Sequence, residues 1–399
     1  MPLANGRTYL AIPGPSVVPE RVLGAMHAPS PNIYDGPLID MVDTLYPDLK
    51  AVAKTGGQVA IYIGNGHGAW EAALSNVASR GDQILVLATG AFGIGWAEAA
   101  TGLGIRAKVL DFGKQSGLDL AQVSAVLSKD KSHKIKAVMC VHADTATSLK
   151  IDIAALRACI DQSDHPALLM VDCIASLGCD AFEMDKWGVD VTVAASQKGL
   201  MLPPGLFFIF FNEKADVAHK SADLTTPYWN WTPRADADKF YRKFCGTAPT
   251  HHLLGLRVAL DMLVKEEGIA NVWERHEKLA RSVWAALDVW GADGPVAMNV
   301  KTPALRSCAV TTVNIGAPLG TKLRKWVEEN TGVTLGISLG MADADDPAWH
   351  GYFRIAHMGH VNAHMTLGVL GVIEAGLSAL DIPHGRGALD AAAAIISKA

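Results

Sequence analysis

The feature that most constrains the fold is an alternation of short apolar runs with helix-like runs between residues 58 and 211. The apolar runs, such as QILVLAT at 83–89 and IKAVMCVH at 135–142, are continuous rather than interleaved with polar residues. Strands of this kind, each followed by a helical run, are typical of a parallel β-sheet covered by helices on both faces. Such a sheet binds ligands at the carboxyl ends of its strands. The sequence therefore predicts an α/β protein with a mostly parallel sheet and a site at that edge.

The pattern changes after the segment that ends at residue 268. A long amphipathic run at 271–291 is followed by shorter strand-like runs and by a further helix at about 362–380. The chain has 399 residues, enough for two domains. We predict a large ligand-binding domain at 21–265 and a smaller α+β domain at 266–399 that also contains residues 1–20.

Composition limits the partners. The net charge is −5, with acids and bases spread along the chain and no basic block that would follow a phosphate backbone, so nucleic acid is not a predicted partner. No run approaches the roughly 20 apolar residues that cross a bilayer, and the first residues lack a secretion pattern. We therefore expect a cytoplasmic protein that does not bind membranes.

The cysteines and histidines do not form a metal-binding pattern. The 6 cysteines lack C-x-x-C spacing, which favours reduced core thiols. Neither the pair His251 and His252 nor the set His357, His360 and His364 has a cysteine or carboxylate cluster beside it at ligand spacing. No metal is predicted.

A glycine-rich turn, Gly-Asn-Gly-His-Gly at 64–68, joins an apolar strand-like run to a helical one. Free backbone N–H groups and the helix dipole at such a junction suit a phosphate. The same residues match the dinucleotide pattern G-x-G-x-x-A, but the next strand ends in Thr89 instead of the acid that would bind a ribose. The turn is therefore compatible with a monophosphate site, a dinucleotide site or a tight turn without a ligand.

Two charged residues stand at the ends of apolar runs. Asp172 ends ALLMVD, and Lys198 is the one charged residue in the 21-residue stretch VTVAASQKGLMLPPGLFFIFF at 191–211. Taken alone, Asp172 fits a structural hydrogen-bond acceptor, and Lys198 fits a lysine whose amine reaches solvent. A desolvated lysine is, however, a nucleophile for carbonyl groups. Phosphate turn, strand-end carboxylate and buried lysine at one sheet edge are together the parts that hold pyridoxal 5′-phosphate.

The run VDCIASLGCDAFEMDKWGVDVTVAASQKGLMLPPGL at 171–206 resembles the cofactor-lysine region of the class V, fold type I aminotransferases, in particular the serine:glyoxylate and alanine:glyoxylate group. The resemblance extends to IPGPSVVPERVLGAM, GNGHGAWEAALSN, VHADTAT, GTAPT and YFRIAHMGH, and so spans nearly the whole chain. It implies a fold type I architecture, with a seven-stranded sheet in the large domain and a smaller C-terminal domain.

The resemblance also implies roles for individual residues. Lys198 is the lysine that binds pyridoxal 5′-phosphate covalently, and Asp172 keeps its pyridine nitrogen protonated. Phe92 stacks on the pyridine ring. The remaining residues implied to bind the cofactor are Asn65, Gly66, His67, Thr147 and Gln197.

Two further implied residues concern the substrate and a second subunit. Arg354 matches the arginine that binds the substrate carboxylate, for which a guanidinium offers two parallel donors. Thr247 matches a residue that reaches the cofactor phosphate of the neighbouring subunit, which implies a homodimer with shared active sites.

The chain departs from the family pattern beside these residues. Phe244 stands where the family often has a tyrosine, and Asp144 and Ser148 replace the glutamate and glycine of H-x-E-T-x-T-G. The segments NIYDGPLI and GMADADDPAWHGY also differ from the family. Because these segments border the substrate in the family, we expect an intact cofactor site and a diverged substrate pocket.

The predicted activity is a transamination from a small amino acid of the serine or alanine type to a 2-oxo acid, glyoxylate or pyruvate. One alternative is a pyridoxamine:pyruvate-type or other class V enzyme with a diverged amino donor. A more distant one is an NAD-dependent dehydrogenase, which would use the turn at 64–68 but gives Lys198 no role.

Overall fold

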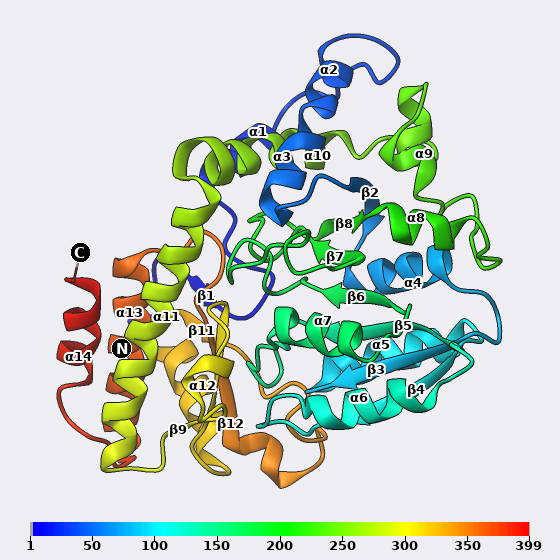
Figure 1. Cartoon of the computed structure of the whole chain (residues 1–399). Coiled ribbons are helices and arrows are strands. Elements are labelled where there is room, and N and C mark those ends of the chain that lie inside the picture. The colour runs from blue at the N-terminus through cyan, green and yellow to red at the C-terminus, as the bar shows by residue number, and fades with distance from the viewer. Residues whose placement is uncertain (1–2, 399) are drawn as a thin grey trace.

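The computed structural model describes residues 3–398, and residues 1, 2 and 399, which belong to the predicted small domain, lie outside the described part. Figure 1 shows a sheet flanked by helices beside a smaller, mainly helical layer that contains the C-terminal helices.

The large sheet has seven strands in the order β2-β8-β7-β6-β5-β3-β4. All neighbouring strands are parallel except β8, which runs antiparallel to β2 and to β7. The predicted mostly parallel, seven-stranded sheet is thus confirmed. In chain order the strands are β2 (Gln58–Gly64), β3 (Gln83–Ala88), β4 (Arg106–Asp111), β5 (Ile135–Val141), β6 (Leu168–Asp172), β7 (Val191–Ala195) and β8 (Gly205–Phe211).

Helices cover both faces of this sheet, as the continuous apolar strands require. One face packs against α3 (Leu45–Ala53), α6 (Leu120–Lys129), α7 (Ile153–Gln162) and α10 (Thr250–Leu260). The other packs against α4 (Gly66–Val77), α5 (Ala91–Gly102) and α8 (Glu213–His219). Shorter helices on the periphery are α1 (Glu20–Met26), α2 (Pro37–Asp43), α9 (Thr232–Ala235) and the 3-10 helix η1 (Phe240–Phe244).

The smaller layer follows the π-helix η2 (Asp261–Glu267) that extends α10. It has a three-stranded antiparallel sheet, β12-β10-β9, and a parallel pair in which the N-terminal strand β1 joins β11. The predicted association of the N-terminal segment with the C-terminal part therefore has a physical basis, whereas the boundary at 265/266 stays a prediction. Its elements are β1 (Tyr9–Ala11), α11 (Ile269–Ala292), β9 (Ala297–Met298), η3 (Pro303–Leu305), β10 (Val310–Asn314), α12 (Leu319–Thr331), β11 (Val333–Leu335), η4 (Pro347–Gly351), β12 (Tyr352–Ala356), α13 (Ala363–Ala379) and α14 (Ala388–Ile396).

Between residues 3 and 398, no helix combines the length and the apolar composition that crossing a bilayer requires.

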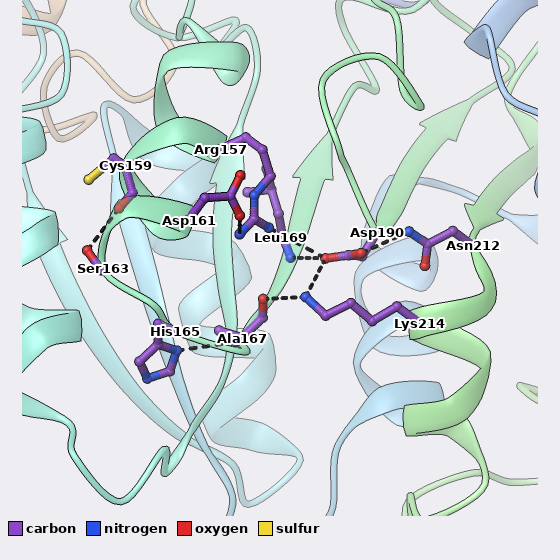
Figure 2. Close-up of polar contacts among 10 residues, drawn as sticks. All are labelled: Arg157, Cys159, Asp161, Ser163, His165, Ala167, Leu169, Asp190, Asn212 and Lys214. Atoms are coloured by element: carbon purple, nitrogen blue, oxygen red, sulfur yellow. Dashed lines mark hydrogen bonds and ion pairs between the residues drawn. The ribbon is translucent and has the colours of Figure 1, made fainter.

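A buried carboxylate secures the amino-terminal edge of the sheet, opposite the predicted site (Figure 2). Asp190 lies directly before β7 and accepts hydrogen bonds from Leu169 N at 2.8 Å and from Asn212 Nδ2 at 2.8 Å. Lys214 Nζ lies 3.4 Å from the carboxylate and Arg157 Nη1 3.9 Å from it. Asp190 therefore joins β6, β7 and α8 at one point.

Replacing Asp190 with alanine is expected to lower the free energy of unfolding by about 3 kcal/mol, because the Leu169 N–H, the Asn212 amide and the Arg157 guanidinium lose a shared buried acceptor. Urea denaturation would measure the change. The matched control is Asp161→Ala, since Asp161 pairs with the same Arg157 at 2.5 Å but is 64% exposed. The control should change stability by less than about 0.5 kcal/mol. Equal effects of the two substitutions would contradict the role given to Asp190.

Candidate active site

A cavity of about 170 Å³ opens at the carboxyl edge of the large sheet, where the sequence places the site. The end of β6 contributes Asp172, the turn after β7 contributes Lys198, and the first turns of α4 and α5 close the sides. The lining residues are Asn65, Gly66, His67, Trp70, Phe92, Val141, Ala143, Thr145, Asp172, Ile174, Ala175, Gln197 and Lys198.

Lys198 is the basic group of this cavity. Its Nζ donates a hydrogen bond to the carbonyl oxygen of Pro13. Burial and, to a lesser extent, the Arg354 guanidinium lower the pKa of Lys198 to about 8, and Asp172 opposes this shift. A substantial part of the amine is therefore neutral near physiological pH and able to act as a nucleophile or base.

The segment at residues 13–16 contacts Lys198 and was not predicted as part of the site. Ser16 Oγ donates to Lys198 O at 2.8 Å, and Ser16 N donates to Gln197 O at 2.9 Å. Gly14 has a φ of +97°, and a Cβ added there would lie 2.6 Å from Lys198 Cε. A glycine between two prolines in IPGPS is the signal that could have indicated a special backbone position.

Asp172 faces the same cavity with its oxygens held by neutral donors. Trp70 Nε1 donates to Oδ2 at 2.7 Å, and Ile174 N donates to Oδ1 at 2.7 Å. Burial raises the pKa of Asp172 to about 7, although these two hydrogen bonds and Lys198 favour the charged form. Trp70 was not predicted as a site residue; it lies on α4, one turn after the glycine-rich turn, where its indole meets the strand end.

The N-terminus of α4 provides the phosphate-sized part of the cavity. Asn65 Oδ1 accepts from His67 N at 3.1 Å and from Gly68 N at 3.4 Å, so its side chain caps the helix. A Cβ on Gly66 would lie 2.7 Å from Ile174 Cδ1, so a larger residue there would require the Ile174 side chain to move. Gln197 Oε1 is buried and has no partner among residues 3–398.

These features fit pyridoxal 5′-phosphate. A 12-residue helix points its N-terminus at the cavity, and a side-chain amide there lacks a partner. The carboxylate of Asp172 and the amine of Lys198 complete the set of groups that the cofactor requires.

Phe92 borders the cavity on α5, half-buried, with its ring centroid 6.3 Å from that of Trp70. Asp144 accepts a hydrogen bond from Phe92 N at 2.9 Å, and Ala146 N donates to the same carboxylate at 2.9 Å. Thr145, between them, lines the cavity. Thr147 does not: its hydroxyl accepts from Leu149 N at 3.2 Å, and its cofactor role stays a prediction without a direct contact to the cavity.

Three other residues singled out in the sequence lie outside the cavity. Ser148 has a φ of +61°, where a glycine is ordinarily favoured, and its Oγ accepts from Thr312 N at 3.1 Å. Phe244 is buried and packs against Phe240. Thr247 is exposed between η1 and α10 and does not contact its own cavity, so its predicted contact with a second subunit stays a prediction.

Arg354 lies on β12 beside the cavity and is 5% exposed. Its Nε donates to Ile337 O at 2.7 Å, and its Nη1 donates to Thr145 O at 2.9 Å. Burial lowers the pKa of Arg354 to about 10, and Asp144 opposes this shift. The structure thus brings a buried cation to the side of the cavity formed by Thr145.

Comparison with known proteins agrees with this geometry. Residues 55–336 match the family model described as aminotransferase class-V. Serine–glyoxylate aminotransferase of Arabidopsis thaliana is 34% identical over 97% of this chain and 94% of its own length. L-aspartate–glyoxylate aminotransferase of Paracoccus denitrificans is 33% identical over 96% and 94%. Pyridoxamine-pyruvate aminotransferase from Mesorhizobium loti has a similar structure, with a TM-score of 0.88 at 22% identity over 99% of this chain and 98% of that one.

Gly14→Ala is expected to weaken binding of pyridoxal phosphate at least about tenfold, because the added methyl group displaces the Lys198 side chain. Titration of the unloaded protein, followed by visible absorption, would measure the dissociation constant. Gly113→Ala is the matched control, since Gly113 has a φ of +79° but no atom within 4 Å of the added Cβ. Equal weakening in both variants would assign the effect to backbone strain and contradict the contact with Lys198.

The depressed pKa of Lys198 has a signature in the unloaded protein. The neutral amine reacts with acetic anhydride, so trace labelling should rise with pH and reach half its maximum at about pH 8. An ordinary lysine, with a pKa of about 10.4, would still be rising above pH 9. Mass spectrometry of the labelled peptides gives both profiles from one sample. A Lys198 profile that coincides with those of exposed lysines would contradict the assigned pKa.

Proposed function

The chain belongs to the class V aminotransferase family, and from that premise we propose that it transfers the amino group of a small amino acid, of the serine or alanine type, to glyoxylate or pyruvate. It is an enzyme, a transaminase, and its cofactor is pyridoxal 5′-phosphate. Its substrates are amino acids and 2-oxo acids.

The observation that carries the proposal is the meeting of Lys198 and Asp172 in one cavity at the N-terminus of α4. Pyridoxal phosphate supplies an electron sink for the charge that develops when the donor loses its Cα proton. Lys198 binds the cofactor in the resting enzyme. With the cofactor and a donor bound, the freed Lys198 amine, whose pKa is about 8 in the unloaded protein, would serve as the base that accepts the Cα proton of the donor.

Asp172 has the role of holding a proton on the pyridine nitrogen. Its two neutral donors orient the carboxylate without neutralising it. A protonated pyridine nitrogen beside Asp172 would be a cation, and it would favour the ionised carboxylate and lower the pKa of Asp172 from about 7. In this proposal Phe92 stacks on the pyridine ring, and Trp70, which also lines the cavity, orients the Asp172 carboxylate.

The character of the lining supports a donor with a small, uncharged side chain. Lys198 is the only lysine or arginine that lines the cavity within the described part of the chain, and Arg354 lies beside it. In this proposal Arg354 binds the carboxylate that every amino acid carries. The second carboxylate of a donor such as aspartate would have no further guanidinium to pair with. The curated relatives named above differ in their donors at nearly equal identity, so the lining is the better guide.

The alternative donor is pyridoxamine, with pyruvate as acceptor, or another amine suited to a diverged pocket. The structural likeness to the Mesorhizobium loti enzyme supports a shared fold. The helix N-terminus and Gln197 support a retained phosphate cofactor instead. A nicotinamide-dependent dehydrogenase gives no role to Lys198, and we do not favour it.

We further propose that the enzyme acts in the cytoplasm as a homodimer. Free cysteines at all 6 positions are compatible with a reducing compartment. The exposure of Thr247 leaves it available to a neighbouring subunit. The distribution of mass in analytical ultracentrifugation would test the dimer.

Addition of L-serine to the loaded enzyme, with no acceptor present, is expected to convert the yellow lysine-bound cofactor to the colourless pyridoxamine form. Absorption spectroscopy would follow the conversion, and glyoxylate should restore the colour. Lys198→Ala is the control and should neither convert the cofactor nor turn over. If L-serine and L-alanine both fail while L-aspartate or pyridoxamine succeeds, the donor proposal is wrong and the aminotransferase assignment stands.

A further inference from the structure

We propose that Asp144 is a positioning residue that sets Arg354 relative to Phe92, and thereby sets the distance between the bound substrate carboxylate and the cofactor ring. The inference rests on the proposed function, which gives Arg354 and Phe92 their roles. Asp144 is the residue at which this chain has a shorter acid than the family pattern.

The carboxylate of Asp144 holds two segments together. Oδ2 accepts from Phe92 N at 2.9 Å at the start of α5, and Oδ1 accepts from Ala146 N at 2.9 Å in its own loop. Asp144 has no solvent exposure, and burial raises its pKa. A carboxylate in this position attracts the N-terminus of a 12-residue helix, which stabilises both the charge and the helix start.

The loop that Asp144 orders also holds Arg354. The carbonyl oxygen of Thr145, the residue that follows Asp144, accepts from Arg354 Nη1 at 2.9 Å. Ala146 O accepts from Thr312 Oγ1 at 2.9 Å, and Thr312 is the register partner of Arg354 in the β10–β12 ladder. Two consecutive carbonyl groups of this loop therefore bind the strand pair that carries the guanidinium.

Gly90 and Gly340 leave room for this arrangement. A Cβ on Gly90 would lie 2.5 Å from Asp144 Oδ2, so any other residue would push the carboxylate away from Phe92 N. A Cβ on Gly340 would lie 2.5 Å from Ala91 Cβ and 2.8 Å from Ala146 Cβ. The segment before Arg354 thus packs against α5 and against the Asp144 loop at once.

A double-mutant cycle in the loaded enzyme tests this inference. The probe is propionate, a monocarboxylate without an amine, whose dissociation constant is measured from the absorption change of the bound cofactor. Asp144→Asn and Arg354→Lys are each expected to raise the dissociation constant about tenfold. The double variant should stay within about threefold of Arg354→Lys, because the contact that Asp144 positions is already lost there.

Asp119→Asn is the matched control. Asp119 caps α6 in the same way, accepting from Ala121 N at 3.0 Å and from Gln122 N at 3.3 Å, at an exposed helix start that does not line the cavity. It should lower the melting temperature without changing propionate binding. If Asp144 had only a structural role, Asp144→Asn would likewise lower the melting temperature and leave the dissociation constant of propionate unchanged.

The outcomes separate this inference from the function on which it rests. Effects that multiply to about a hundredfold in the double variant, or an unchanged dissociation constant in Asp144→Asn, would overturn the positioning role alone. Unchanged binding in Arg354→Lys would overturn the carboxylate-binding role of Arg354 and the inference with it. If Asp144→Asn does not fold, the same cycle with Gly90→Ala decides, because the added methyl group displaces the carboxylate without removing it.

Discussion

The desolvation of two ionisable groups at the ends of neighbouring strands governs this structure. Burial moves the pKa of Lys198 down to about 8 and that of Asp172 up to about 7, so both titrate close to neutral pH. Each has a neutral partner, the Pro13 carbonyl for the amine and the Trp70 indole for the carboxylate. A chain can hold such groups only where surrounding packing determines their positions, and here the sheet and its two apolar layers provide that packing. The shift of Lys198 suits its amine to proton transfer, whereas the raised pKa of Asp172 means that its ionised form depends on a cation beside it.

The sequence was sufficient to predict the parts of the fold that depend on local patterns. Continuous apolar runs predicted the strands, and their carboxyl ends predicted where Asp172 and Lys198 meet. The antiparallel direction of β8 was not predicted, because an apolar run reads the same in either direction. The connection from Ala195 to Gly205 held the missing information, since parallel neighbours need a crossover of a dozen or more residues.

The site residues that the sequence missed are those placed by long-range contacts or by irregular backbone. Pro13 reaches Lys198 across 185 positions, and Trp70 reaches Asp172 across 102. In a regular strand Thr145 and Thr147 would face the same side, but here the chain turns, with Ser148 N donating to Asp144 O at 2.7 Å. Thr145 consequently lines the cavity and Thr147 does not. Motif matching aligns residue types and cannot determine which of two similar hydroxyl groups a turn directs inward.

The N-terminal segment contacts both Lys198 and the strands beside Arg354. Strand β1 pairs with β11, and the next residue after β11, Gly336, exchanges backbone hydrogen bonds with Arg354 at 2.9 Å. A Cβ on Gly336 would lie 2.8 Å from Pro13 Cδ, so the segment that contacts Lys198 also lies against the strand pair of Arg354. The segment before residue 20 therefore contacts Lys198 through Pro13 and lies against the strand that carries Arg354, so it shapes the cavity together with the strand ends.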